Sequence, residues 1–147
     1  MSDKHSIKGK VVLIAGGAKN LGGLIARDLA GQGAKAVAIH YNSAASRADA
    51  EATMAAVQAL GARAIALQAD LRSAAAVEKL FADTIAALGR PDIAINTVGK
   101  VLKRPIAEIS EAEYDEMSAV NAKSAFFFVK ESGKHVNDHG KVLTIVT

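Results

Sequence analysis

The sequence predicts an α/β fold in which a doubly wound, mostly parallel sheet lies between two layers of helices. Short apolar runs alternate with longer stretches of helical spacing, which is the order of parallel βαβ units. A glycine-rich stretch, AGGAKNLGG at residues 15–23, separates the first apolar run from the first helical stretch. We call it the glycine turn. We therefore expect one three-layer α/β/α domain over residues 1–147, built on five strands.

Apolar runs rich in β-branched residues are the predicted strands. They cover residues 10–15, 35–40, 63–68, 91–97 and 141–146. No further strand follows the last of these in the sequence, so we expect it at an edge of the sheet. An apolar edge strand favours association with other chains. We therefore expect the isolated chain to associate or to be marginally stable.

The first two helices are predicted from helical spacing and terminal glycines. One covers residues 21–32 before Gly33, and the other covers 44–60 before Gly61. The first has an apolar face made of Leu21, Leu24, Ile25 and Leu29. In the second, we expect three side chains to face inward, those of Met54, Val57 and Leu60.

Capping residues predict where the later helices begin. Ser73 is a candidate N-cap for a helix that ends before Gly89. Ser110 and Glu113 have the spacing of a capping box, and helical pattern continues from there to about His135.

Composition excludes several classes of protein. The chain has no cysteine, which rules out disulfides and thiol chemistry. Its formal net charge of +3 comes from scattered basic residues, so no nucleic-acid partner is expected. The N-terminal stretch is polar and no apolar run reaches membrane-spanning length, so we expect a cytoplasmic protein with no membrane partner. The histidines are dispersed, and we expect no metal site.

The glycine turn predicts a binding site for a nucleotide diphosphate. Glycine leaves room for phosphate and adopts the positive φ that such turns need. The following helix points its unpaired N–H groups and positive dipole end at the phosphate. Polar residues gather where the predicted strands end, at the sheet edge where such folds bind ligands. They are His40, Tyr41, Asn42, Ser43, Asp70, Asn96 and Thr97.

The chain resembles the short-chain dehydrogenase/reductase family over its whole length. The family's T-G-x-x-x-G-x-G turn corresponds to residues 15–22, and its N-N-A-G motif corresponds to NTVG at 96–99. Asp70 resembles the acidic residue that contacts adenine, and Asn121 resembles the helix asparagine that holds a water in the proton relay. The resemblance implies a Rossmann-like NAD(P)-binding domain. The cofactor-binding residues that it implies are Gly16, Lys19, Asn20, Leu21, Gly22, Asp70, Leu71, Asn96, Val98 and Gly99.

The sequence departs from the family pattern at three places. Asn20 stands at a glycine position, where asparagine is the side chain that best tolerates left-handed backbone. Ala15, Thr97 and Val98 replace motif residues without touching the chemistry. The family's Y-x-x-x-K pair is missing, although Thr147 falls about where the catalytic serine would stand. We therefore interpret the chain as the N-terminal portion of a reductase, with the C-terminal part of the sheet absent.

The end of the second predicted strand favours NADP over NAD. An NAD-binding chain would be expected to place a carboxylate there for the ribose 2′-hydroxyl, and this sequence has none. Tyr41, Asn42 and Ser43 could donate hydrogen bonds to a 2′-phosphate, and Lys19 and Arg47 could supply charge.

The resemblance implies an NADP-dependent oxidoreductase that reduces a carbonyl or oxidises the matching alcohol. The carbonyl would be 3-oxoacyl-like, a ketone or a sugar, and basic residues at 100–104 would favour an anionic or carrier-linked substrate. We expect a homo-oligomer, with Asn121 and Thr147 as the catalytic residues present. Without the tyrosine and lysine, the chain alone is expected to bind cofactor without catalysis. The alternative is a non-catalytic nucleotide-binding or oligomerisation module.

Overall fold

The computed structural model describes residues 5–146 and contains a single parallel sheet. Five strands form it in the spatial order β3-β2-β1-β4-β5. They are β1 (Val11–Ala15), β2 (Ala36–Tyr41), β3 (Arg63–Gln68), β4 (Ile93–Asn96) and β5 (Lys141–Thr144). All four strand pairings are parallel, which confirms the predicted doubly wound α/β/α architecture.

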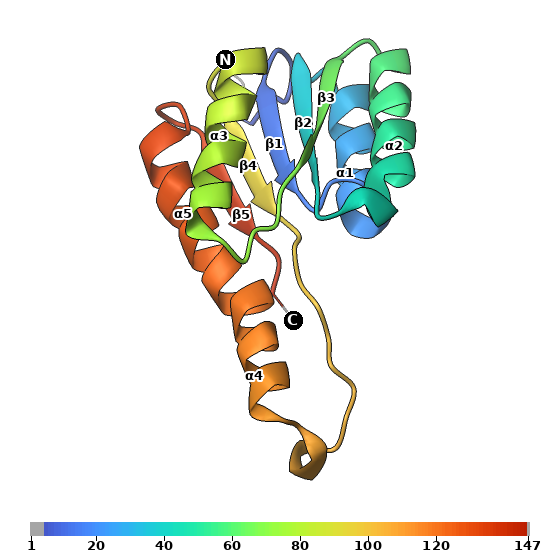
Figure 1. The fold of residues 1–147 in the computed structure, drawn as a ribbon. Helices are drawn as coiled ribbons and strands as arrows, with labels where there is room; N and C mark the ends of the chain where they lie inside the picture. Colours follow the sequence, from blue (N-terminus) through green and yellow to red (C-terminus); the bar gives the residue numbers. More distant parts are fainter. Residues whose placement is uncertain (1–4, 147) are drawn as a thin grey trace.

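Helices cover both faces of the sheet (Figure 1). On one face lie α1 (Asn20–Gly31) and α2 (Arg47–Ala59), and on the other lie α3 (Ala74–Leu88) and α5 (Ser124–His135). Each face has its own apolar core, because successive strand residues point to opposite sides. Val12, Ile14, Val37 and Ile39 pack under α1 and α2, whereas Leu13 packs against the opposite pair.

The predicted caps are confirmed. The Ser73 hydroxyl accepts a hydrogen bond from the Ala76 N–H at 3.4 Å and starts α3. Ser110 and Glu113 form the reciprocal capping box of α4 (Glu111–Met117), with the Ser110 N–H donating to Glu113 Oε2 at 2.9 Å. From α4 the helical path continues without a break through η3 (Ser118–Lys123), a π-helical segment, into α5.

The apolar face expected for the first helix is wrong at two positions. Leu21 and Leu24 are 47% and 62% exposed, whereas Ile25 and Leu29 are partly buried against the core. The buried stripe of α1 is made of small residues, because the helix lies too close to the sheet and to the glycine turn for larger ones. These residues are Gly22, Gly23, Ala26 and Ala30. Leu60 is also 51% exposed, because α2 ends at Ala59 before it.

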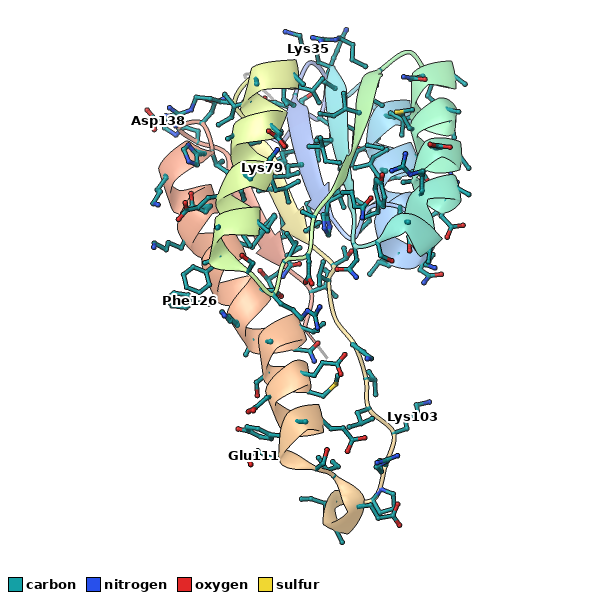
Figure 2. The ribbon with its side chains drawn as sticks, viewed as in Figure 1. Lys35, Lys79, Lys103, Glu111, Phe126 and Asp138 are labelled. Carbon is teal, nitrogen blue, oxygen red and sulfur yellow. The ribbon has the colours of Figure 1, made fainter. Side chains whose placement is uncertain are left out.

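Two further features lie outside the packed layers. An arm of the chain, residues 100–117, extends beyond the sheet and carries α4 and the short helix η2 (Ile106–Glu108) (Figure 1). Lys103 and Glu111 lie on this arm, far from the strands (Figure 2). At the other extreme, β5 forms the predicted edge, with Val142 and Leu143 43% and 44% exposed. In the described residues, no helix is long and apolar enough to cross a membrane.

Candidate functional site

A cavity of about 790 Å³ opens at the carboxyl ends of the strands. It lies where the strand order reverses, since the chain runs outward from β1 to β3 on one side and continues with β4 on the other. Residues that the sequence predicts as cofactor-binding, brought here from four different loops, make up much of its wall. They are Gly16, Lys19, Asn20, Leu21, Gly22, Tyr41, Asn42, Asp70, Leu71, Val98 and Gly99.

The glycine turn packs so closely that side chains are excluded at two positions. Gly16 has a φ of +76°, and a Cβ there would lie 2.6 Å from Thr97 Oγ1. A Cβ on Gly22 would collide with the carbonyl group of Gly16, at 2.8 Å from its carbon. These glycines therefore bring the first turn of α1 directly against the backbone of the turn.

The N-terminus of α1 is open toward the cavity. Its N-cap residue, Lys19, makes no side-chain cap hydrogen bond, and no acidic residue stands in the first turn. Asn20 has a φ of 51°, the left-handed conformation that the sequence predicts for this glycine position. The first N–H groups of a helix lack intrahelical partners, so this end presents donors and a positive dipole to an anion.

Three side chains hold the glycine turn in place. The Thr97 hydroxyl donates to the carbonyl oxygen of Ala15 at 2.8 Å and approaches that of Gly16 at 3.2 Å. The buried Thr53 hydroxyl, from α2, donates to the carbonyl oxygen of Ala18 at 2.6 Å. His40, at the end of β2, accepts a hydrogen bond from the Gly16 N–H at 3.0 Å. The turn is thus preorganised by β2, α2 and the segment after β4.

The end of β2 differs in part from the prediction. Tyr41 is only 7% exposed and packs mainly in the core under α1 and α2, while Asn42 is exposed on the cavity wall. Ser43 and Arg47 are not part of that wall, because η1 (Ala44–Ser46) turns the chain before α2 and presents Ser46 instead.

Lys19 has a partner that the sequence did not indicate. Its ammonium lies 3.3 Å from Oδ2 of Asp49, which stands in the first turn of α2. Both side chains are about half exposed, at 54% and 47%, so the pair is accessible to solvent and to a ligand. Exposed pairs of this kind contribute little stability. The Asp49 carboxylate therefore lies close to the site predicted for a 2′-phosphate, although Asp49 belongs to α2 and does not directly follow β2.

Asp70 is engaged by Arg72. The guanidinium holds both carboxylate oxygens, with Nη2 at 2.5 Å from Oδ2 and Nε at 3.0 Å from Oδ1. This hydrogen bonding is the main reason that the pKa of Asp70 is lowered from its ordinary value. Arg72 itself lines the cavity, and Leu71 between them is 3% exposed.

Two of the predicted residues after β4 line the cavity, and a third supports them from beneath. Val98 and Gly99 line the cavity, whereas Asn96 is 1% exposed and lies beneath it. The Asn96 side chain accepts from the Val98 N–H at 3.0 Å and so shapes the segment that follows β4. Its amide nitrogen is buried with no hydrogen-bond partner in the described part of the chain.

The Asn121 side chain forms hydrogen bonds with backbone groups of the protein. Its side-chain oxygen accepts from the Lys100 N–H at 2.9 Å, and its amide donates to the Lys100 carbonyl at 2.9 Å. The same amide nitrogen lies 3.0 Å from the Met117 carbonyl oxygen. The side chain therefore ties the start of the arm to η3, and the neighbouring Val120 and Ser124 face the cavity. Thr147, the other predicted catalytic residue, lies outside the described residues.

Several wall residues were not predicted as binding residues. Thr97 and Lys100 belong to segments that the sequence did mark, but Ser46, Arg72 and Glu116 come from segments without a motif. Glu116 reaches the wall through an ion pair with Lys100 at 2.8 Å, which lowers the pKa of its carboxyl group. His40 and Thr97 were expected only as polar strand-end residues. The wall residues outside the predicted cofactor-binding set are Ala18, His40, Ser46, Arg72, Thr97, Lys100, Glu116, Val120 and Ser124.

Comparison with known proteins identifies the family. The family model described as short chain dehydrogenase matches residues 10–147. The chain is 33% identical over 139 residues to the short chain dehydrogenase mdpC of Emericella nidulans, covering 95% of this chain and 51% of the relative. It is 35% identical over 143 residues to versicolorin reductase 1 of Aspergillus parasiticus, covering 97% and 53%. The chain thus spans about half the length of the curated relatives it matches.

Solved structures agree with the observed fold. A putative dehydrogenase from Burkholderia cenocepacia with bound NADP superposes with a TM-score of 0.97 at 72% identity, over 100% of this chain and 56% of that one. A short-chain dehydrogenase from Oenococcus oeni matches with a TM-score of 0.85 at 44% identity, over 97% and 64%. The chain belongs to the short-chain dehydrogenase family, and its fold is the Rossmann-like fold predicted from the sequence.

Proposed function

We propose that the chain forms the NADP-binding part of an oxidoreductase that interconverts a carbonyl compound and its alcohol. The uncapped N-terminus of α1, set against the glycine turn at a cavity wall, is the observation that carries this proposal. It agrees with membership of the family and with the NADP that the Burkholderia cenocepacia dehydrogenase binds. When bound, the cofactor supplies or accepts the hydride.

The diphosphate is assigned to the first turn of α1. The backbone N–H groups of Asn20, Leu21 and Gly22 would hold it, and Gly16 leaves room beside them. The close packing at Gly16 and Gly22 and the three hydrogen-bonded braces on the turn support this assignment. Because the turn is already held, little ordering of the backbone accompanies binding.

The 2′-phosphate is assigned to the mouth of the cavity between Lys19 and Asn42. Lys19 would supply charge and Asn42 a hydrogen bond. Ser43 and Arg47 remain proposed contributors that would have to reach past η1, and Tyr41 would act from its largely buried position. The absence of a carboxylate directly after β2 supports NADP over NAD.

The remaining roles follow the family resemblance. Asp70 and Leu71 would flank the adenine, and Val98 and Gly99 the ribose, with Asn96 supporting them from below. Asn121 would contribute to the proton relay from η3, and Thr147 would bind the substrate carbonyl. For the substrate we propose a small or carrier-linked carbonyl compound, 3-oxoacyl-like, a ketone or a sugar.

We further propose that these 147 residues bind cofactor without turnover. Tyr41 is followed four residues later by Ala45, and Tyr114 by Ser118, so neither tyrosine has the lysine of the family's Y-x-x-x-K pair. A homo-oligomer is proposed because Phe126 and Val129 of α5 are 66% and 47% exposed. Figure 2 shows Phe126 pointing away from the sheet. A cytoplasmic location remains a prediction.

Calorimetric titration with NADPH and NADH tests the cofactor assignment. We expect tighter binding of NADPH, and Lys19→Ala should weaken NADPH binding more than NADH binding. Lys35→Ala is the matched control, because Lys35 lies at the opposite end of the sheet (Figure 2) and should change neither. Equal or tighter binding of NADH by the unaltered chain would overturn the preference for NADP.

A further inference from the structure

His40 is a buried polar residue on the cavity wall that no motif explains. Its side chain is 2% exposed and projects from the last part of β2 toward the α3 side of the sheet, as Ala36 and Ala38 do. Two hydrogen bonds hold the imidazole. Nδ1 lies 3.0 Å from the Gly16 nitrogen, and Nε2 lies 2.8 Å from the carbonyl oxygen of Ala69.

The two partners define the protonation state of the imidazole. A backbone N–H can only donate, so Nδ1 must carry a lone pair toward Gly16. A carbonyl oxygen can only accept, so Nε2 must carry the proton toward Ala69. Both hydrogen bonds therefore exist only in the neutral imidazole with its proton on Nε2. A second proton on Nδ1 would place two donors face to face at the 3.0 Å contact.

These partners belong to two different segments, which follow β1 and β3 on either side of β2. Gly16 is the second residue of the glycine turn, and its carbonyl group packs against Gly22 at the start of α1. Ala69 immediately precedes Asp70, in the segment that follows β3. His40 thus bridges the segment assigned to the diphosphate and the segment assigned to adenine, and it spans three neighbouring strand ends.

We propose that His40 is a positioning residue that fixes the spacing of these two segments, so that acidification weakens cofactor binding. This inference rests on the proposed function of the cavity. Protonation would remove the acceptor for the part-buried Gly16 N–H and replace it with a second donor. Gly16 would then shift, and Gly22, which is in contact with it, would shift with it.

Opposing effects act on the pKa of His40. Burial lowers the pKa of the imidazole from 6.5 and is the largest effect, whereas the hydrogen bond to Ala69 and the charge of Asp70 raise it. The other charged groups on the cavity wall are Lys19 from the glycine turn, Arg72 after β3, Lys100 on the arm and Glu116 from α4. Arg72 is paired with Asp70.

The lowered pKa of His40 sets the direction in which stability changes with pH. The unfolded chain takes up the proton near pH 6.5, whereas the folded chain takes it up only at lower pH. The contribution of neutral His40 to stability is therefore complete above pH 6.5 and is lost as the pH falls below it. Cofactor affinity should follow the titration of the folded state, falling by up to about tenfold per pH unit below its pKa.

Nitrogen NMR of the histidine-labelled chain without cofactor tests the bridge itself. We expect a neutral imidazole with its proton on Nε2 at pH 7.5, and a Gly16 amide protected from hydrogen exchange. Protection of Gly16 should be lost together with the protonation of His40. An imidazole that is charged at neutral pH, or protonated on Nδ1, would overturn the proposal whether or not the cofactor binds.

Calorimetric titration with NADP⁺, from pH 8 down to the pH at which NMR shows His40 protonated, tests the consequence. The 2′-phosphate also titrates near pH 6, so His40→Gln provides the reference. Its amide can accept from Gly16 and donate to Ala69 but does not titrate, and we expect binding at pH 7.5 with a shallower pH profile. His139→Asn, in an exposed loop, is the matched control and should keep the steep profile of the unaltered chain.

The outcomes separate the two proposals. Parallel pH profiles for the unaltered chain and His40→Gln would overturn the role of His40 while leaving the NADP assignment intact. If His40→Gln does not fold, the NAD⁺ profile of the unaltered chain over the same pH range decides, because NAD⁺ has no 2′-phosphate, and a flat profile would overturn the proposal. Failure of NADP⁺ to bind at pH 7.5 would instead contradict the proposed function.

Discussion

The ammonium of Lys19 lies 3.3 Å from a carboxylate oxygen of Asp49, so the cation assigned to the 2′-phosphate already has an anionic partner. The two residues come from the start of α1 and the start of α2, and the pair lies beside the open end of the cavity. A bound 2′-phosphate would compete with Asp49 for Lys19 and would also be repelled by it. We therefore expect the pair to influence how strongly the proposed site favours NADP.

Asp49→Asn should strengthen NADPH binding and leave NADH binding nearly unchanged. The substitution frees Lys19 and removes a negative charge near the phosphate, and the gain should be up to about fivefold, because an exposed ion pair contributes at most about 1 kcal/mol. Calorimetric titration measures it. Asp83→Asn, which breaks the exposed Lys79–Asp83 pair on α3, is the control. Unchanged NADPH affinity in Asp49→Asn would contradict this role of the pair.

Gly22→Ala should abolish tight cofactor binding and destabilise the fold. Its Cβ would collide with the carbonyl group of Gly16 and lie 2.9 Å from Thr97 Oγ1, so α1 must move away from the glycine turn. Overpacking of this kind typically costs about 1–3 kcal/mol. Urea unfolding gives the loss. Gly31→Ala in the same helix meets nothing within 4 Å and should unfold at the same or a higher urea concentration. Equal stability of both variants would show that the turn has room for a side chain.

Asn20 tests the conformation of the glycine turn independently. Its φ of 51° disfavours most side chains, so Asn20→Val should destabilise the fold by about 1–2 kcal/mol. Asn20→Gly should be tolerated and should retain NADPH binding, because glycine adopts this conformation freely. Thermal unfolding compares the two. A valine variant as stable as the glycine variant would mean that residue 20 does not need left-handed backbone.

Arg72 controls the ionisation of Asp70. Its hydrogen bonds hold the pKa of that carboxyl below the ordinary value of 3.8, so Arg72→Gln should raise the pKa toward that value. The folded state then binds protons more readily, and stability should fall less steeply as the pH drops below 4. Carbon NMR of the Asp70 carboxyl follows the titration, and an unchanged pKa in the variant would contradict the pairing.

Because β5 lies at the edge of the sheet, we expect the chain to associate with other copies of itself. Val142 and Leu143 of β5 are exposed beside unpaired backbone groups, which is a template for pairing with another chain. Sedimentation should show oligomers or aggregates, and Leu143→Lys should reduce them. Leu24→Lys is the control, since Leu24 is 62% exposed on α1, far from β5. A monodisperse monomer that melts cooperatively would contradict this prediction.

The sequence predicted the strands and the glycine turn because each depends on local chemistry. Apolar runs rich in β-branched residues favour strands, as in the fully buried β1. Gly16 is needed for its positive φ, and Gly22 for its contact with the carbonyl group of Gly16 six residues earlier. The helix faces could not be predicted as well. Leucines dominate a hydrophobic pattern, but α1 approaches the sheet so closely that only small residues fit beneath it, which leaves Leu21 and Leu24 outside.

The parts of the candidate site formed by motif backbone could be predicted from the sequence. The side-chain contacts that depend on the tertiary fold could not. Glu116 and Asp49 form ion pairs with lysines distant in the sequence, and Arg72 pairs with Asp70 two residues before it, which no motif indicated. Ser43 and Arg47 lie outside the cavity wall because the short helix η1 turns the chain there, and no residue pattern indicated this helix. His40 stood among the predicted strand-end residues, but its role requires the two backbone groups that only the fold brings to it.

A crystal structure of the chain grown with NADP⁺ tests the central proposal most directly. We expect diphosphate oxygens within hydrogen-bond distance of the N–H groups of Leu21 and Gly22, and the 2′-phosphate between Lys19 and Asn42. A dinucleotide bound elsewhere on the molecule, or with its 2′-phosphate turned away from Lys19, would contradict it.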